Sequence, residues 1–167
     1  MFVIEVNERL SNELGDSLQH TSVSKDVKNI YRWDMCLVTV KQRKCVIIVN
    51  KETGLNLTLF DLRQAQFENM SHVLRGSLKQ LFQLLEMKSS ITEHMLKEAE
   101  EIEYLPLGDE EPSGMVKAVQ QSVEKMVTGL DYEEIDAVHI NLRNNREMNC
   151  ESLKGRTPYE TFVNYFQ

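Results

Sequence analysis

One stretch, from Trp33 to Phe60, constrains the fold of this chain more than any other part of its sequence. It holds three short apolar runs rich in Val, Ile, Leu and Thr, a composition typical of β-strands, at residues 36–40, 45–49 and 55–60. A polar turn at 41–44 separates the first two runs, and a turn at 50–54 with Asn and Gly separates the last two. Because connections this short usually join antiparallel neighbours, the stretch predicts a three-stranded meander.

Two further strands complete the expected sheet. Short apolar runs near residues 2–6 and 102–106 have strand composition, and a Pro ends the second run. Together with the meander over 36–60, they predict an α+β fold whose sheet is mainly antiparallel and is packed by helices. A length of 167 residues is typical of one domain, so we expect a single globular domain over 1–167.

Helices are predicted where apolar residues recur at steps of three and four. This spacing covers 71–87, 116–130 and 132–142. The pair Thr157-Pro158 predicts the start of a last helix, with Thr as the cap and Pro in the first turn. The segment 141–155 is polar and is predicted to be irregular.

Charge and hydropathy argue against several function classes. The chain has a formal net charge of -7 and a pI of about 5.2, which argues against non-specific binding to nucleic acid. It contains no apolar run long enough to span a bilayer, and its first ten residues lack the basic region of a signal peptide. We therefore expect a soluble, cytoplasmic protein that does not enter a membrane.

The sequence carries no catalytic signature. Its three cysteines, Cys36, Cys45 and Cys150, form no CxxC or His/Cys cluster, so no metal site is predicted. Cys36 and Cys45 fall in apolar strand runs, which favours buried, inert thiols. The common phosphate-loop, dinucleotide, metalloprotease and hydrolase motifs are missing as well. Catalytic residues are therefore unknown, and no cofactor is predicted.

A first set of candidate ligand-binding residues lies in the meander. Trp33, the only Trp, would either wall a ligand pocket or fill the core, and large aromatic side chains usually serve packing. Lys41, Arg43 and Lys44 would either grip a phosphate or form a solvated hairpin turn, which is the commoner role of charged turns. Asn50, at the end of the second apolar run, is the last candidate of this set.

A second set of candidates lies near the end of the chain and comprises Arg143, Asn145 and Arg146. An Arg that lies near Asn side chains can bind a carboxylate or a phosphate. The alternative is hydrogen bonding within a loop, which short polar side chains favour.

Two patches of the sequence are motif-like. The first combines Trp33, the basic turn at 41–44, Asn50 and Thr53, and the second combines Asn-Asn-Arg at 144–146 with Thr-Pro-Tyr-Glu at 157–160. In these patches the chain resembles an uncharacterised bacterial family, a domain of unknown function. It departs from that family's pattern at Met148, where the family has a Pro, and in a longer segment at 16–29. The resemblance supports the fold, and it carries no activity.

Two hypotheses for function follow. The first is a non-catalytic binding or regulatory module that contacts a protein partner, because no catalytic signature is found. The alternative is an enzyme or binding protein for a phosphorylated or nucleic-acid ligand, which the two sets of candidate residues would hold. One observation separates them: the ligand hypothesis requires Trp33, Asn50 and Arg146 to surround one concave pocket. The oligomeric state and the partner's identity stay open.

Overall fold

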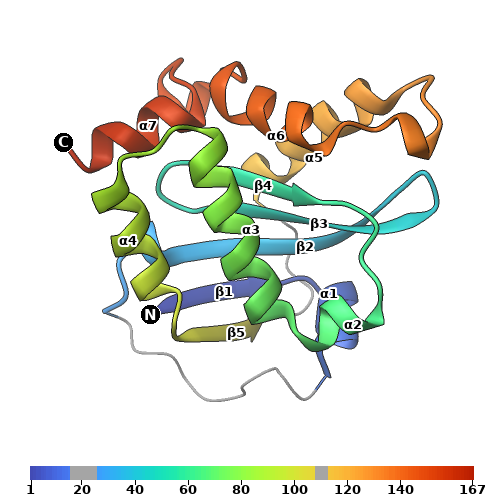
Figure 1. Ribbon diagram of the computed structural model, residues 1–167, viewed down its shortest axis with the longest axis horizontal. Helices are drawn as coiled ribbons and strands as arrows, with labels where there is room; N and C mark the ends of the chain where they lie inside the picture. Colours follow the sequence, from blue (N-terminus) through green and yellow to red (C-terminus); the bar gives the residue numbers. More distant parts are fainter. Residues whose placement is uncertain (16–25, 108–112) are drawn as a thin grey trace.

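A five-stranded sheet with helices on both faces forms the centre of the molecule (Figure 1). The computed structural model describes residues 1–15, 26–107 and 113–167. The strands follow the spatial order β4-β3-β2-β1-β5. Their bounds are β1 Phe2–Val6, β2 Arg32–Val40, β3 Arg43–Asn50, β4 Asn56–Leu59 and β5 Ile102–Pro106. The predicted α+β class and all five predicted strands are thus confirmed.

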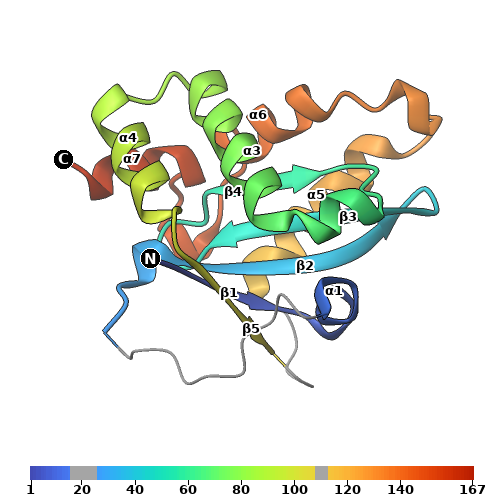
Figure 2. The same cartoon turned by 60° about the horizontal axis from the view of Figure 1, so that its bottom comes forward.

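The sheet is mixed, so the prediction of a mainly antiparallel sheet needs correction. The meander β2-β3-β4 is antiparallel as predicted, but β1 pairs in parallel with both β2 and β5 (Figure 2). The physical reason is the length of the connections. Short turns join the strands of the meander, whereas β5 follows β4 only after three helices, and a crossover of that length delivers a parallel strand.

The first turn of the meander is shorter than predicted. Val40 pairs with Arg43, so only Lys41 and Gln42 form the turn, and both have positive φ (50° and 68°), as in a type I′ hairpin. Arg43 and Lys44 therefore belong to β3.

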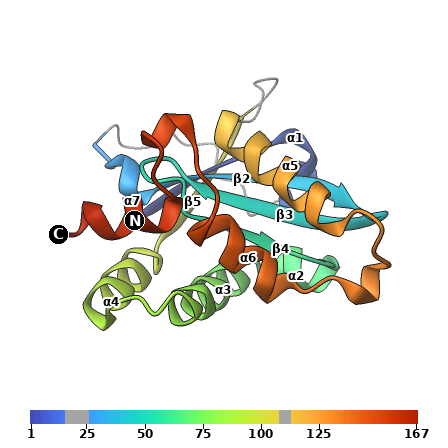
Figure 3. The same ribbon diagram turned by 90° about the horizontal axis from the view of Figure 1, so that it is seen from above.

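One face of the sheet, face A, carries Trp33, Met35 and Leu37 of β2, and the other, face B, carries the residues between them, because side chains alternate along a strand. Face A packs against buried apolar residues of five helices. These are α1 Glu8–Leu14, α2 Gln64–Glu68, α3 Met70–Leu84, α4 Ser89–Glu98 and α7 Pro158–Tyr165. Figure 3 shows α3 and α4 on one side of the sheet and α5 on the other. Since both faces are covered, the central strands are apolar almost throughout.

Face B packs against α5 Gly114–Val127, whose Val116, Val119, Val123 and Val127 form one buried stripe, and against Ile140 of α6 Ala137–Arg146. Short 3-10 turns occupy Asn29–Tyr31, Tyr132–Glu134 and Glu151–Leu153. The helix predicted over 132–142 is thus divided into the second of these turns and α6. The prediction that 141–155 is irregular is wrong for its first six residues, which are the last turns of α6.

Cys36 and Cys45 lie buried on face B as free thiols, as predicted. Burial, with the charge of Asp34 as a second cause, raises the pKa of Cys36 to about 12. None of the helices in the described ranges is both long enough and apolar enough to cross a membrane.

Candidate functional site

Trp33 is a core residue. It is 1% exposed on face A, and its ring centroid lies 5.4 Å from that of Phe2. The only Trp of the chain therefore packs in the core of face A beside Phe2 and does not face an open pocket.

Asn50 closes the turn between β3 and β4. Its Oδ1 accepts hydrogen bonds from the backbone N of Glu52 and Thr53, each at 3.1 Å, and from the Thr53 hydroxyl at 3.0 Å. Its Nδ2 donates to the carbonyl of Ile30 at 2.8 Å. The Asn-x-x-Thr pattern is thus explained by turn geometry, since an Asn side chain readily bonds to backbone groups two and three residues on.

Two of the three basic residues of the hairpin, Arg43 and Lys44, are already paired with carboxylates, while Lys41 is an exposed residue of the turn. Arg43 lies 3.4 Å from Glu133 and 3.6 Å from Asp61, and its guanidinium is 3.9 Å from the centroid of the Tyr132 ring. Lys44 forms an ion pair with Glu13. An anion that approached this hairpin would compete with these carboxylates, which weakens the case for phosphate binding there.

Asn141 and Asn145 of α6 seal the edge of the sheet at β4. The Asn145 amide accepts from the backbone N of Asn56 at 2.9 Å and donates to its carbonyl at 2.8 Å. The Asn141 amide makes the same pair of bonds with Thr58, at 2.8 and 3.0 Å. Four residues along a helix and two along a strand cover similar distances, so both side chains can reach β4 at once. We call these two residues the asparagine pair. They make the hydrogen bonds to the edge of β4 that a further strand would otherwise make.

The neighbouring arginines point to other partners. Arg143 pairs with Glu147 one turn later, at 2.8 Å, and Arg146 lies 5.3 Å from the centroid of the Tyr159 ring. Trp33 and Arg146 do not line the pocket that Asn50 borders. The condition set above for a shared ligand pocket is therefore not met.

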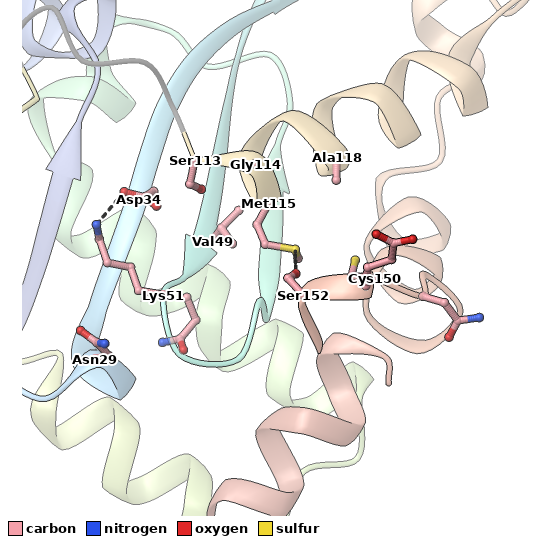
Figure 4. Close-up of a pocket in the computed structure, with 13 residues that line it drawn as sticks. Asn29, Asp34, Val49, Lys51, Ser113, Gly114, Met115, Ala118, Cys150 and Ser152 are labelled. Carbon is pink, nitrogen blue, oxygen red and sulfur yellow. Dashed lines mark hydrogen bonds and ion pairs between the residues drawn. The ribbon is translucent and has the colours of Figure 1, made fainter. Parts of the chain in front are cut away.

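A different set of residues forms a cleft on face B. It has a volume of about 840 Å³ and lies between the ends of β2 and β3, the first turn of α5 and the segment 149–152. We call it the central cleft (Figure 4). Its polar lining includes Asp34, Lys51, Ser113 and Ser152, while Met115 contributes an apolar wall. Segments far apart in the sequence thus converge on one concave surface, as ligand sites usually require.

Three charged side chains, Glu5, Asp34 and Lys51, are linked by ion pairs and form what we call the charged triad, of which Asp34 and Lys51 line the cleft. Asp34 of β2 is only 4% exposed. The ammonium of Lys51, just after β3, lies 3.3 Å from Asp34 and 2.7 Å from Glu5 of β1, and Figure 4 shows it directed toward Asp34. Burial lowers the pKa of Lys51, but the hydrogen bond to Glu5 and the charge of Asp34 outweigh it, so this pKa lies above its ordinary value.

The other side of the cleft is anchored by two turns. Ser113 caps α5, since its hydroxyl accepts a hydrogen bond from the backbone N of Val116 at 3.4 Å. Gly54, at φ 75°, lets the β3–β4 turn approach Met115 so closely that a Cβ would lie 2.7 Å from the Met115 Cε. Cys150 completes this side, and burial raises the pKa of its thiol.

The central cleft has little electrophilic or nucleophilic capacity. The Lys51 ammonium stays protonated at neutral pH, and the cysteine thiol at the rim stays neutral. In the described ranges, no group of three or more His, Cys, Asp and Glu side chains is arranged to hold a metal ion. What the cleft offers is hydrogen-bonding groups of both charges beside an apolar wall.

The family described as "Domain of unknown function (DUF6933)" matches residues 3–161. The chain belongs to this family. The predicted resemblance to a domain of unknown function is confirmed over nearly the whole chain, including both motif-like patches. Within the family fold, these patches have structural roles here: Asn50 and Thr53 form a turn, and Asn145 seals a sheet edge. Among curated proteins, none matches the chain.

Sequence reasoning missed the charged triad. One signal was present: Asp34 is the only acidic residue in the apolar run of β2, and it follows Trp33 directly. A carboxylate inside such a run has to find a partner when the strand is buried. Its partner Lys51 directly follows β3 in the predicted meander, whereas Glu5, which pairs with the same lysine, comes from β1 through a parallel pairing that was not predicted.

Proposed function

We propose that the chain is a non-catalytic binding module whose ligand occupies the central cleft. The observation that carries this proposal is Asp34, a nearly buried carboxylate that borders an open cleft and is joined to Lys51. The nearest neighbours of Asp34 on this face of β2 and β3, Cys36, Val49 and Ile47, are apolar, whereas polar face B residues such as Glu5, Asn56 and Thr58 lie on β1 and β4.

A charged group in that position has to be explained. Buried ion pairs give little net stability, because the cost of removing two charges from water offsets their attraction. An apolar residue at position 34 would extend the packing of face B at a lower cost. Ligand binding gives a reason for the Asp34–Lys51 pair to be kept there, since a lysine with a perturbed pKa in a cleft is a candidate for a functional site.

The chemistry of the cleft favours binding over catalysis. Lys51 is held protonated between two carboxylates, so it is a poor base and a poor nucleophile. Burial raises the pKa of the Cys150 thiol at the rim, so this thiol is protonated as well. The cleft therefore acts through fixed charges and hydrogen bonds.

The lining also indicates the kind of ligand. Of the charged residues that line the cleft, Asp34 and Lys51 offset each other and Glu151 leaves one net negative charge, to which Glu5 adds through its contact with Lys51. A small polar molecule with an ammonium or another hydrogen-bond donor fits these carboxylates. Its apolar part would contact Val49, Met115 and Ala118.

A thermal-shift screen of small cationic and polar metabolites tests this proposal. We expect ligands that raise the melting temperature of the unmodified protein and fail to do so for Asp34→Asn. Asp61→Asn is the matched control, because Asp61 has positive φ, which Asn tolerates, and lies by the hairpin. Ligands that stabilise both variants equally would show that they bind elsewhere.

A protein partner is the second candidate, and one groove favours it. Three large apolar side chains are exposed in the described ranges, and two of them, Leu84 (37%) and Val138 (49%), border the same groove between α3 and α6. Exposed apolar side chains that gather in one place typically mark protein contacts. A photo-crosslinker at Val138 should capture one defined protein, and Leu84→Asp should abolish the adduct. Capture that Leu84→Asp does not change would reject this surface.

The proposal includes a cytoplasmic location. All three cysteines are free thiols, which is typical of a reducing compartment. Alkylation of the protein in intact cells should find all three reduced.

A further inference from the structure

One buried hydrogen-bond donor of α6 lacks an acceptor among the described residues. Asn144 of α6 is 1% exposed, and its Oδ1 accepts a hydrogen bond from the Ser122 hydroxyl of α5 at 2.6 Å. Its Nδ2 is buried and makes no hydrogen bond to any described residue. Buried polar groups nearly always have a partner, so an unpaired amide points to a group that binds there.

Asn144 borders a cavity of about 360 Å³ between α5 and α6, which we call the α5/α6 cavity. The same cavity is lined by Ser122, by the cations Lys125 and Arg143, and by one carboxylate, that of Glu147. Arg143 and Glu147 form an ion pair at 2.8 Å, and Lys125 adds a further positive charge. The lining therefore carries one net positive charge in a protein whose overall charge is -7.

We propose that the α5/α6 cavity binds the phosphoryl group of a small molecule. A phosphoryl oxygen would accept the missing hydrogen bond from the Asn144 amide, while Lys125 and Arg143 balance its charge. Three donors, the Asn144 amide, Lys125 and Arg143, favour a phosphoryl group over a carboxylate, because a phosphoryl group offers three strong acceptor oxygens. This site lies at the last turns of α5, whereas the central cleft lies at the first turn, and it does not rest on the function proposed for that cleft.

An interaction of Lys125 and Arg143 with the helix dipoles is a simpler role for these cations, but it does not explain the unpaired amide of Asn144. Lys125 and Arg143 lie in the last turns of their helices, where positive side chains interact favourably with the helix dipole. That role requires only exposed charges. It leaves the Asn144 Nδ2 buried and unpaired, and it does not predict which side chains respond to an added anion.

Titration with inorganic phosphate, followed by ¹H–¹⁵N spectra at constant ionic strength, tests the proposal. We expect saturable shifts of the Asn144 side-chain NH₂ resonances, and weaker shifts with acetate. Lys125→Met and Arg143→Met should each weaken phosphate binding about tenfold, the size expected for one lost charge-assisted contact. Glu147→Gln should strengthen binding, because it removes the carboxylate that competes for Arg143.

Lys79→Met is the matched control, since Lys79 is equally exposed on another helix and lies outside this cavity. It should leave phosphate binding unchanged. The proposal is overturned if the Asn144 resonances do not respond to phosphate. It is also overturned if Lys79→Met weakens binding as much as Lys125→Met does, which would indicate a general effect of net charge.

Discussion

The asparagine pair and the charged triad are both sets of polar side chains inside the described fold, and they differ in one respect. The side-chain amides of Asn141 and Asn145 are satisfied within the protein, because each donates to and accepts from the backbone of β4. Asp34 and Lys51 pair with each other at 3.3 Å and still border the central cleft.

This difference distinguishes polar residues that stabilise the fold from polar residues that can bind a ligand. A polar network that is fully satisfied within the protein stabilises one arrangement and has nothing left to offer a ligand. A charge that faces an open cleft keeps part of its hydrogen-bonding capacity for a molecule that enters. The residues that look most like a motif in the sequence, Asn50 and Asn145, are of the first kind, and Asp34 is of the second.

The largest expected effect is that of Asn145→Leu. It leaves the backbone N–H and C=O of Asn56 buried without partners, and each costs roughly 1–3 kcal/mol, so we expect a loss of about 4 kcal/mol in unfolding free energy. Urea denaturation measures it. Asn164→Leu, on the exposed face of α7, is the control and should change stability by less than about 0.5 kcal/mol. Equal losses of unfolding free energy in the two variants would show that the asparagine pair does not stabilise the fold through its bonds to β4.

Lys51→Met should have the next largest effect, about 2 kcal/mol, because it leaves the Asp34 and Glu5 carboxylates side by side without a cation. This is below the usual cost of breaking a buried pair, since Lys51 is partly exposed. Adding Asp34→Asn should restore much of the lost stability, as measured by urea denaturation. A double variant no more stable than Lys51→Met would show that the triad is not electrostatically coupled.

Cys36 gives a pH dependence of defined sign. Burial raises its thiol pKa from 9.0 to about 12, so the folded state keeps a proton that the unfolded state loses between these values. Stability therefore falls as pH rises through this window, by up to about 1.4 kcal/mol per pH unit from this group. Cys36→Val should make the decline between pH 9 and 11 shallower in denaturation curves. An unchanged slope would mean that Cys36 does not stay protonated.

The smallest effect is expected at the hairpin. Replacing Lys41, Arg43 and Lys44 together by Ser should lower the unfolding free energy by about 1 kcal/mol, because exposed ion pairs and two cation–π contacts contribute little. Phosphate affinity, measured by calorimetry, should stay the same. A large loss of affinity would place the anion site at this hairpin instead of the α5/α6 cavity.

Periodicity and turn chemistry predicted most of the elements. The meander and the helices α3 and α5 follow from apolar spacing, and the Thr157-Pro158 pair marks the start of α7. These signals are local, so the sequence alone carries them.

What could not be predicted depends on contacts between distant segments. The last turns of α6 looked irregular because Asn141, Asn144 and Asn145 are polar, yet all three are buried, two of them by hydrogen bonds to the edge of β4. Glu5 joins the charged triad only through the parallel pairing of β1 with β2, and this register is set by a crossover that contains a helix. Asp34 and Lys51 meet within the predicted meander and were missed because the candidate residues were chosen by residue type and not by strand register.

The central claim is that Asp34 and the first turn of α5 form one ligand site. The most direct test is a set of ¹H–¹⁵N spectra of labelled protein titrated with a ligand from the thermal-shift screen. The claim predicts shifts at the backbone amides of Gly114, Met115 and Ser152, and their loss in Asp34→Asn. Shifts that cluster at Ala137 and Val138 instead, and that survive Asp34→Asn, would contradict it and move the binding site to the groove between α3 and α6.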